Sequence, residues 1–305
     1  MLKIIKNILK KIQLILSISL LFLFSCERNQ RYNSLEKRIT ELLKSQNGTF
    51  AVAFKNLEDG SEIYINEEEI FHAASTMKTP VMIEVFKKNM MGKISLDDTI
   101  LVKNEFKSIV DKSTFKLSEF DDSDRNTYDK IGKFISLREL VFDMITISSN
   151  FATNLVIDYI GTKSINKTMR EIGAKKINIL RGVEDIKAFD KGLSNTTSAI
   201  DLLVIYEKLA MGKILSKTLS NEMVGILKKQ KYDDIIPKYL PKNIEVAHKD
   251  GWITGVRHDS GIIFLDNGKK YVLVLLSKNL DSEIDGGDLL AKVSLEIYNT
   301  VTGNL

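Results

Sequence analysis

Segments with the pattern of β-strands lie near both ends of the chain, and segments with the pattern of helices fill the middle. Apolar runs bounded by turn residues predict five strands, over Thr49 to Phe54, Glu62 to Ile65, Ile244 to Lys249, Gly261 to Leu265 and Tyr271 to Leu276. Strands at both ends, with helices between them, imply one sheet assembled from the two termini. The sequence therefore predicts an α/β (α+β) fold, in which helices flank an antiparallel sheet and an all-helical subdomain is inserted.

Apolar residues recur three and four positions apart through most of the intervening chain, which is the spacing of one helical face. The helices predicted in this way cover Leu35 to Leu43, a segment that begins near Ser75, Leu137 to Ile145, Ala152 to Tyr159, Ser164 to Ile172, Ser198 to Met211, Ser216 to Lys229 and Ile284 to Val301. Residues 104–133 are polar, and we expect a loop there. These patterns predict one domain over 34–305, with its sheet part in 34–74 and 240–305 and its helical part in about 75–235.

The first 26 residues have the pattern of a secretory signal, because a Lys-rich start is followed by an apolar run from Leu14 to Phe24. Ser25 before the only cysteine, Cys26, resembles a bacterial lipobox. A membrane-spanning helix is the alternative, but it needs about 20 apolar residues, and two lysines and a glutamine interrupt this stretch. We expect a signal peptide over 1–25 and a lipidated tether over 26–33. The protein would then be a membrane-anchored lipoprotein of the bacterial cell envelope, facing the periplasm or the exterior.

Charge and composition exclude several function classes. The formal net charge of +4 is accounted for by four lysines in the signal segment, and no basic stripe with interleaved aromatic residues is present, so we expect no nucleic-acid partner. A single cysteine rules out an intrachain disulfide. The three histidines, His72, His248 and His258, are too scattered for a convincing zinc site. We expect neither a metal nor a cofactor.

Ser75 and Lys78 begin a segment with the features of a buried helix. Residues three apart share a helix face, so the hydroxyl and the ammonium are expected to point the same way, about 5–6 Å apart at Cβ. Burial would lower the pKa of Lys78, and the amine could then accept the hydroxyl proton. Ser-x-x-Lys also occurs elsewhere in this Lys-rich chain, where it is more often a solvated helix face, so the pair needs other groups beside it.

Two further motifs supply those groups. Ser148-x-Asn150 lies between two predicted helices, and Lys249-Asp250-Gly251 lies on a late predicted strand. In this order and placement the three motifs resemble the penicillin-recognising serine enzymes, and class A β-lactamases in particular. The resemblance runs from about residue 34 to the end of the chain.

The resemblance implies a reaction and a set of residue roles. Ser75 would attack a carbonyl and Lys78 would take its proton, while Ser148 would pass a proton to the leaving nitrogen. Asn150, Lys249 and Gly251 would belong to the substrate-binding cleft. The backbone N–H groups of Ser75 and Trp252 would hold the oxyanion. The implied activity is hydrolysis of a β-lactam amide, a small-molecule substrate, through an acyl-enzyme, and we expect the enzyme to be a monomer. Each residue also has a structural alternative, such as Asn150 capping the helix that follows it.

Three departures from the family pattern bear on this reading. Ser149 replaces the middle aspartate of Ser-Asp-Asn, at a position that faces structure more than substrate. Asp250 stands where the family has a hydroxyl residue, and an ionised carboxylate there would repel a substrate carboxylate. Arg257 is a candidate replacement cation, or a plain surface arginine. Glu184 is the candidate base for deacylation, or the partner of Arg181 in a loop salt bridge.

Two rival readings stay open beside this one. Ala188 stands where the family has an asparagine four residues after its glutamate, which favours slow deacylation, as in an esterase or a D,D-peptidase-like enzyme. A non-catalytic envelope-binding lipoprotein is the rival from another class. A Ser-His-Asp hydrolase is disfavoured, because Ser75 has Ala73 and Met77 where a nucleophile elbow needs glycines.

Overall fold

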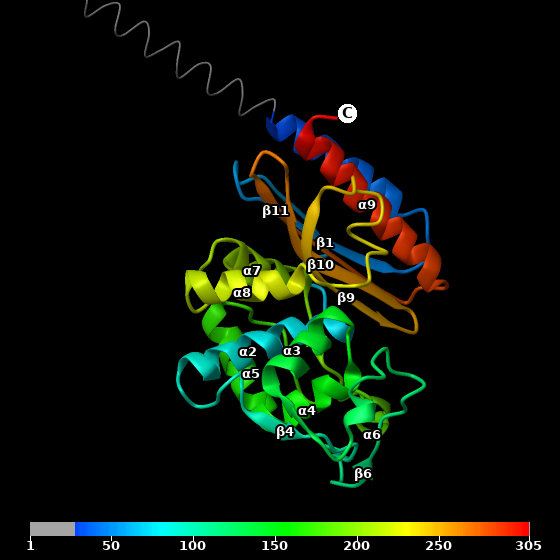
Figure 1. The fold of residues 1–305 in the computed structure, drawn as a ribbon. Coiled ribbons are helices and arrows are strands. Elements are labelled where there is room, and N and C mark those ends of the chain that lie inside the picture. Colours follow the sequence, from blue (N-terminus) through cyan, green and yellow to red (C-terminus); the bar gives the residue numbers. More distant parts are fainter. Residues whose placement is uncertain (1–27, 305) are drawn as a thin grey trace, which may run out of the picture.

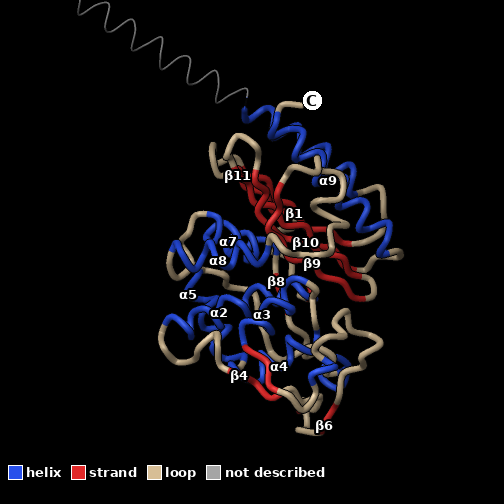
Figure 2. Tube along the Cα trace, viewed as in Figure 1, coloured by secondary structure: helices blue, strands red, loops and turns tan. Residues whose placement is uncertain are grey.

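The computed structural model describes residues 28–304 (Figure 1). Five strands form one antiparallel sheet in the order β2-β1-β11-β10-β9, and their bounds are Thr49–Asn56 (β1), Glu62–Ile65 (β2), Glu245–Ile253 (β9), Val256–Phe264 (β10) and Lys270–Lys278 (β11). Figure 2 shows these strands gathered in one part of the molecule and helices filling the other. The predicted fold class, an antiparallel sheet from both chain ends with an inserted helical part, is confirmed.

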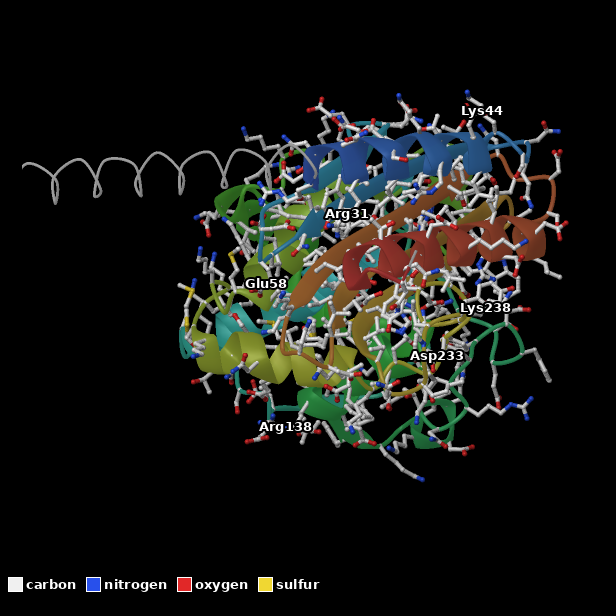
Figure 3. All side chains as sticks on the ribbon, turned by 90° about the horizontal axis from the view of Figure 1, so that it is seen from above. Arg31, Lys44, Glu58, Arg138, Asp233 and Lys238 are labelled. Atoms are coloured by element: carbon white, nitrogen blue, oxygen red, sulfur yellow. The ribbon has the colours of Figure 1, made fainter. Side chains whose placement is uncertain are left out.

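Both faces of the sheet are covered, which explains the continuous apolar runs of the central strands. Along β1, Val52 and Phe54 face one apolar core, whereas Ala51 and Ala53 face the other. The first core lies under a helix over residues 28–43 and the C-terminal helix α9 (Glu283–Thr302). These two helices lie side by side across the sheet (Figures 1 and 3), and Arg38 Nε donates to Glu296 Oε2 at 3.2 Å between them. The termini of the described chain therefore share one layer.

The opposite face packs against the helical part of the chain. Its helices are α2 (Lys78–Met90), α3 (Leu137–Thr146), α4 (Asn150–Ile160), α5 (Thr162–Ile172), α6 (Ile186–Asp190), α7 (Ala199–Ala210) and α8 (Lys217–Leu227), with 3-10 turns at η1 (Ala74–Met77) and η2 (Tyr128–Lys130). Short strand pairs join the loops, and they are β3 (Phe71–His72) with β8 (Thr196–Thr197), β4 (Thr99–Leu101) with β7 (Phe134–Ser136), and β5 (Phe106–Lys107) with β6 (Thr114–Phe115). Within the predicted loop over 104–133, the structure has only the strands β5 and β6 and the turn η2.

The chain start corrects one expectation. Residues 28–33 continue the first helix, so a tether over these residues is wrong, while Cys26 and the signal segment lie outside the described residues. Tyr32 explains the difference, because its ring stacks on Phe54 with centroids 5.7 Å apart and its hydroxyl accepts a hydrogen bond from Asn56 Nδ2 at 3.1 Å. Between residues 28 and 304, no helix is both long and apolar enough to cross a membrane.

Strand β10 begins five residues before the predicted start at Gly261. The segment from Arg257 to Ser260 has a polar sequence, yet all four residues are buried. Asp259 accepts hydrogen bonds from His248 Nδ1 at 2.9 Å and from the N–H of Ile236 at 3.0 Å. Paired polar groups can occupy a buried strand, and the apolar pattern used to predict strands does not detect them.

Candidate active site

Ser75 lies on the turn η1, one residue after a strained backbone position. The sequence predicted an α-helix from about Ser75, but the structure has one 3-10 turn and begins α2 at Lys78. Ala74 has a φ of +43°, a region that L-residues rarely adopt. The Ala73 N–H donates to Asn195 O at 2.8 Å, and the Ala74 N–H donates to His72 Nδ1 at 3.0 Å. Such strain persists where neighbours fix the backbone, as they do here, and it is characteristic of active sites.

Lys78 is fully buried under this turn. Its ammonium donates to Ser148 O at 2.6 Å, to Ser148 Oγ at 3.1 Å and to Asn150 Oδ1 at 2.9 Å. Burial, reinforced by the nearby charge of Lys249, lowers the pKa of Lys78 to about 7. The Ser75 hydroxyl is not among the hydrogen-bond partners of Lys78 Nζ in this structure, so the predicted pair is not joined by a direct hydrogen bond.

Ser148 and Asn150 lie at the junction of α3 and α4. Ser148 has a φ of +57°, and the buried Ser149 is the N-cap of α4, where its Oγ accepts from the N–H of Ala152 at 3.0 Å. Asn150 is therefore the first residue of α4, and capping does not explain it. The carboxylate of Asp122 accepts the N–H groups of Asn150 at 3.1 Å and Phe151 at 2.8 Å. Because a helix N-terminus favours negative charge, Asp122 holds this junction in place.

Glu184 contacts Asn150 in the lining of the cleft. Asn150 Nδ2 donates to Glu184 Oε1 at 2.7 Å, so one asparagine contacts both Lys78 and Glu184. Burial raises the pKa of Glu184 above its usual range. Arg181 does not pair with Glu184, since its guanidinium donates to the carbonyls of Leu193 and Gly182, each at 2.9 Å. The alternative of a loop salt bridge is therefore wrong.

The backbone that carries Glu184 is fixed by Asn154 on α4. Asn154 Oδ1 accepts from the Val183 N–H at 2.7 Å, and its Nδ2 donates to Val183 O at 3.0 Å. Gly182 lies so close that a Cβ there would come 2.3 Å from Asn154 Oδ1. Glu184 itself has a φ of +61°. Ala188 has no polar side-chain atom, and its N–H is already used by the Asp185 carboxylate that caps α6.

Strand β9 passes beside the serine and brings Lys249, Asp250 and Gly251 to the cleft. A Cβ on Gly251 would come 3.1 Å from Ala74 Cβ and 3.2 Å from Ser75 N, so glycine permits this close approach. Lys249 is fully buried and donates to Asp250 Oδ1. Burial opposes ionisation of Asp250, but Lys249 outweighs it and lowers the pKa of the carboxyl. Asp250 is therefore a carboxylate at neutral pH.

Trp252 and Arg257 face each other across β9 and β10. The guanidinium of Arg257 lies 5.7 Å from the Trp252 ring centroid, and it forms an ion pair with Asp234. Only 8% of Arg257 is exposed, so the reading of a plain surface arginine is wrong. Trp252 is 64% exposed at the mouth of the cleft.

The cleft has two lobes that meet at Ser75, Asn150 and Trp252. The Glu184 lobe has a volume of about 360 Å³ and an apolar wall formed by Val183, Ile186, Phe189 and Ile253. The Ser148 lobe has a volume of about 310 Å³ and is lined by polar side chains, among them Ser148, Asp121, Asp234, Asp250 and Arg257. The structure thus brings the predicted site residues together around one cleft.

Three residues that support the site escaped the sequence reading, namely Asp122, Asn154 and Asn195. Asn195 Oδ1 accepts the N–H groups of Leu180 at 2.8 Å and Arg181 at 3.1 Å, so this residue ties the Glu184 loop to the Ser75 turn. Each of the three uses its side chain to satisfy backbone groups of a distant loop. In the sequence the only signal was an Asn or Asp inside a predicted loop or helix. The backbone groups that these side chains bind are brought near only by the fold.

Comparison with known proteins places these features in a family. Residues 34–301 match the model of the β-lactamase enzyme family. The chain is 25% identical over 279 residues to β-lactamase BRO-1 of Moraxella catarrhalis, covering 87% of this chain and 85% of the relative. It is 27% identical over 252 residues to a β-lactamase of Proteus vulgaris, covering 80% and 78%. The structure of PBP-A, solved as an acyl-enzyme complex with penicillin G, superposes with a TM-score of 0.77 at 27% identity, covering 89% of this chain and 97% of that one. The chain therefore belongs to the β-lactamase enzyme family, and the prediction of a hydrolase of this type is confirmed.

Proposed function

We propose that the protein cleaves a β-lactam amide through a covalent acyl-enzyme at Ser75. The observation that carries this proposal is the buried Lys78, which contacts Ser148 and Asn150 at the floor of the cleft where both lobes meet at Ser75. The Ser75 oxygen attacks the lactam carbonyl, the carbon–nitrogen bond breaks, and the nitrogen takes up a proton. Water then attacks the resulting ester, which releases the acid and restores the Ser75 hydroxyl.

The proton follows a route that the geometry supports. A pKa of about 7 leaves a large fraction of Lys78 as the neutral amine at neutral pH, able to accept the proton that Ser75 loses. Ser148 Oγ lies 3.1 Å from Lys78 Nζ and can pass a proton from this amine to the leaving nitrogen. Because Ser148 lines only one of the two lobes, the leaving group belongs in the Ser148 lobe.

The oxyanion is assigned to the backbone N–H groups of Ser75 and Trp252. The close passage of Gly251 along Ser75 supports this assignment, since it brings the β9 backbone to the serine. Preorganised donors of this kind stabilise the tetrahedral intermediate by about 3–4 kcal/mol each in well-studied cases.

Deacylation is assigned to Glu184. It lines the other lobe, where the acyl half remains after the leaving group departs, and burial makes it a stronger base. The apolar wall of this lobe favours an apolar acyl group. Ala188 offers a water no side-chain hydrogen bond, which favours a second candidate, a slowly deacylating esterase or D,D-peptidase-like enzyme that acylates in the same way.

Intact-protein mass spectrometry tests the acylation step. After exposure to a penicillin, a cephalosporin or an activated ester, we expect a covalent adduct on the wild type and none on Ser75→Ala. An adduct that survives the substitution, or no adduct with any of the three reagents, contradicts the proposal and favours a binding protein. An adduct that persists for hours instead of turning over favours the slowly deacylating candidate.

We also propose that the mature protein is a lipoprotein anchored to a bacterial membrane through Cys26. The lipobox-like Ser25-Cys26 after an apolar run supports this proposal. A single acyl chain binds only marginally, whereas several chains anchor firmly. When expressed with Cys26→Ser, the protein should move from the membrane fraction to the soluble envelope fraction, and unchanged membrane association contradicts the proposal.

A further inference from the structure

The charges of the Ser148 lobe point to the kind of leaving group that it accepts. We propose that this lobe selects substrates whose leaving-group half carries no negative charge, and that Asp250 and Asp234 are the residues that determine this specificity. The inference rests on the proposed function, because it requires that the leaving group occupies the Ser148 lobe. It adds the class of substrate, namely lactams, esters or amides with a neutral or cationic leaving half.

The first cation near this lobe, Lys249, is neutralised by its sequence neighbour. Its ammonium is fully buried and donates to Asp250 Oδ1, while Asp250 also accepts from Gln230 Nε2 at 3.3 Å. Asp250 lines the lobe, whereas Lys249 does not. An incoming substrate therefore meets the carboxylate, and the ammonium lies behind it.

The second cation, Arg257, is neutralised by Asp234. The ion pair is part of the lobe wall, since both residues line it, and the guanidinium also lies against the Trp252 ring. With Asp121 added, the wall carries three carboxylates and one guanidinium. A substrate carboxylate would have to displace Asp234 from Arg257 and would still lie close to Asp250.

Asp234 is held at this place by its neighbours. On one side, Asp233 Oδ1 lies 3.4 Å from Nε2 of the buried His248. On the other side, the N–H of Ile236 donates to the buried Asp259 at 3.0 Å. Asp259 also contacts His248 Nδ1, so both anchors, one of them through the exposed Asp233, end on the buried His248–Asp259 pair. The segment that carries Asp234 is therefore fixed to β9 and β10, and its carboxylate belongs to the lobe wall.

A charge series of one chromophore tests the inference without any mutation. The substrates are the cephalosporin nitrocefin with its free carboxylate, the methyl ester of that carboxylate, and the 2-aminoethyl ester, which carries a cation. We expect kcat/KM of the wild type to rise along this series, by about tenfold from acid to neutral ester, which is the effect of about 1.4 kcal/mol. The ratio should shrink as salt screens the charges.

Isosteric variants assign the effect to residues. Asp250→Asn and Asp234→Asn should each raise the ratio of kcat/KM for the free acid to kcat/KM for the methyl ester by about tenfold, because each change removes a charge that repels only the acid. Glu58→Gln is the matched control, because the same change of charge is made in the β1–β2 turn, where Glu58 is exposed. Activity on the ester also reports that each variant is folded.

The outcomes separate this inference from the proposed function. If the wild type hydrolyses the free acid as well as or better than the methyl ester, or if neither aspartate variant changes the ratio, the inference is wrong and the proposed function stands. If no member of the series forms an adduct on Ser75, the proposed function fails. A rise with charge in the wild type that is removed by either variant supports the inference.

Discussion

At the scale of single residues, the burial of Lys78 predicts how acylation depends on pH. Below pH 7 the ammonium predominates, donates all its protons to Ser148 and Asn150, and has no lone pair for the Ser75 proton. The acylation rate constant should therefore rise with pH, with its midpoint near 7, and level off above about pH 8. Lys78→Arg should lower it by about 10²–10⁴-fold at all these pH values, because arginine stays charged.

Stopped-flow acylation by an activated ester at several pH values measures this profile. In Glu184→Gln the acylation rate constant should still rise with pH but with its midpoint at a lower pH, since that carboxylate acts after acylation while its charge raises the pKa of Lys78. A midpoint near pH 10, where a solvated lysine titrates, would show that Lys78 is not the base.

The role assigned to Glu184 predicts that a substitution can slow deacylation without slowing acylation. Glu184→Gln keeps a hydrogen-bonding partner for Asn150 but removes the basic oxygen, so the acyl-enzyme should form at the wild-type rate and decay about 10²–10⁴-fold more slowly. A burst of one product equivalent per enzyme, followed by a slow phase, is the expected record. Equal loss of the burst and the slow phase would instead place Glu184 in the acylation step.

At the scale of elements, the close contact between β9 and η1 explains why acylation should require glycine at position 251. In Gly251→Ala the new Cβ would lie 3.1 Å from Ala74 Cβ, so the strand and the turn must separate. The shift needed is a few tenths of an ångström, and because a displacement of about 1 Å at a reacting group lowers rates by about 10²-fold, we expect a smaller loss of acylation rate, on the order of several-fold. Gly225→Ala is the control, since no atom lies within 4 Å of a Cβ in α8 and alanine favours the helix. Acylation at the wild-type rate in both variants contradicts the argument.

The elements also show what the sequence could and could not predict. The helices with regular apolar spacing and the strands β1 and β11 follow from apolar patterns, because packing against two cores imposes those patterns. The start of β10, with Arg257 to Ser260, and the short helix α6 do not, because ion pairs and an Asp185 cap stabilise them. In the site, the ordered motifs were sufficient to select Ser75, Lys78 and Asn150. Their supports Asp122 and Asn195 satisfy backbone groups that only the folded chain brings near.

At the scale of the whole molecule, the sheet separates a stabilising layer from the catalytic layer. The helix over 28–43 and α9 cover one face of the sheet (Figure 1), whereas the cleft is lined by residues of η1, α4 and β9 among others, and η1 and α4 belong to the helical part of the chain. The two apolar cores are distinct and meet only through the strands between them. Changes in the layer formed by the helix over 28–43 and α9 should therefore alter the free energy of unfolding without altering the chemistry at Ser75.

Leu35 allows a direct test of this separation. Its side chain is fully buried under the sheet-covering helix, so Leu35→Ala should lower the free energy of unfolding by about 2–5 kcal/mol. Lys37→Ala, on the exposed face of the same helix, should change it by less than about 0.5 kcal/mol. Urea unfolding measures both, and acylation by an activated ester, per folded molecule, should stay within about twofold of the wild type in each. If Leu35→Ala slowed acylation in the folded protein while Lys37→Ala did not, the helix layer would be coupled to the Ser75 turn through the sheet, and the separation argued from the two cores would be wrong.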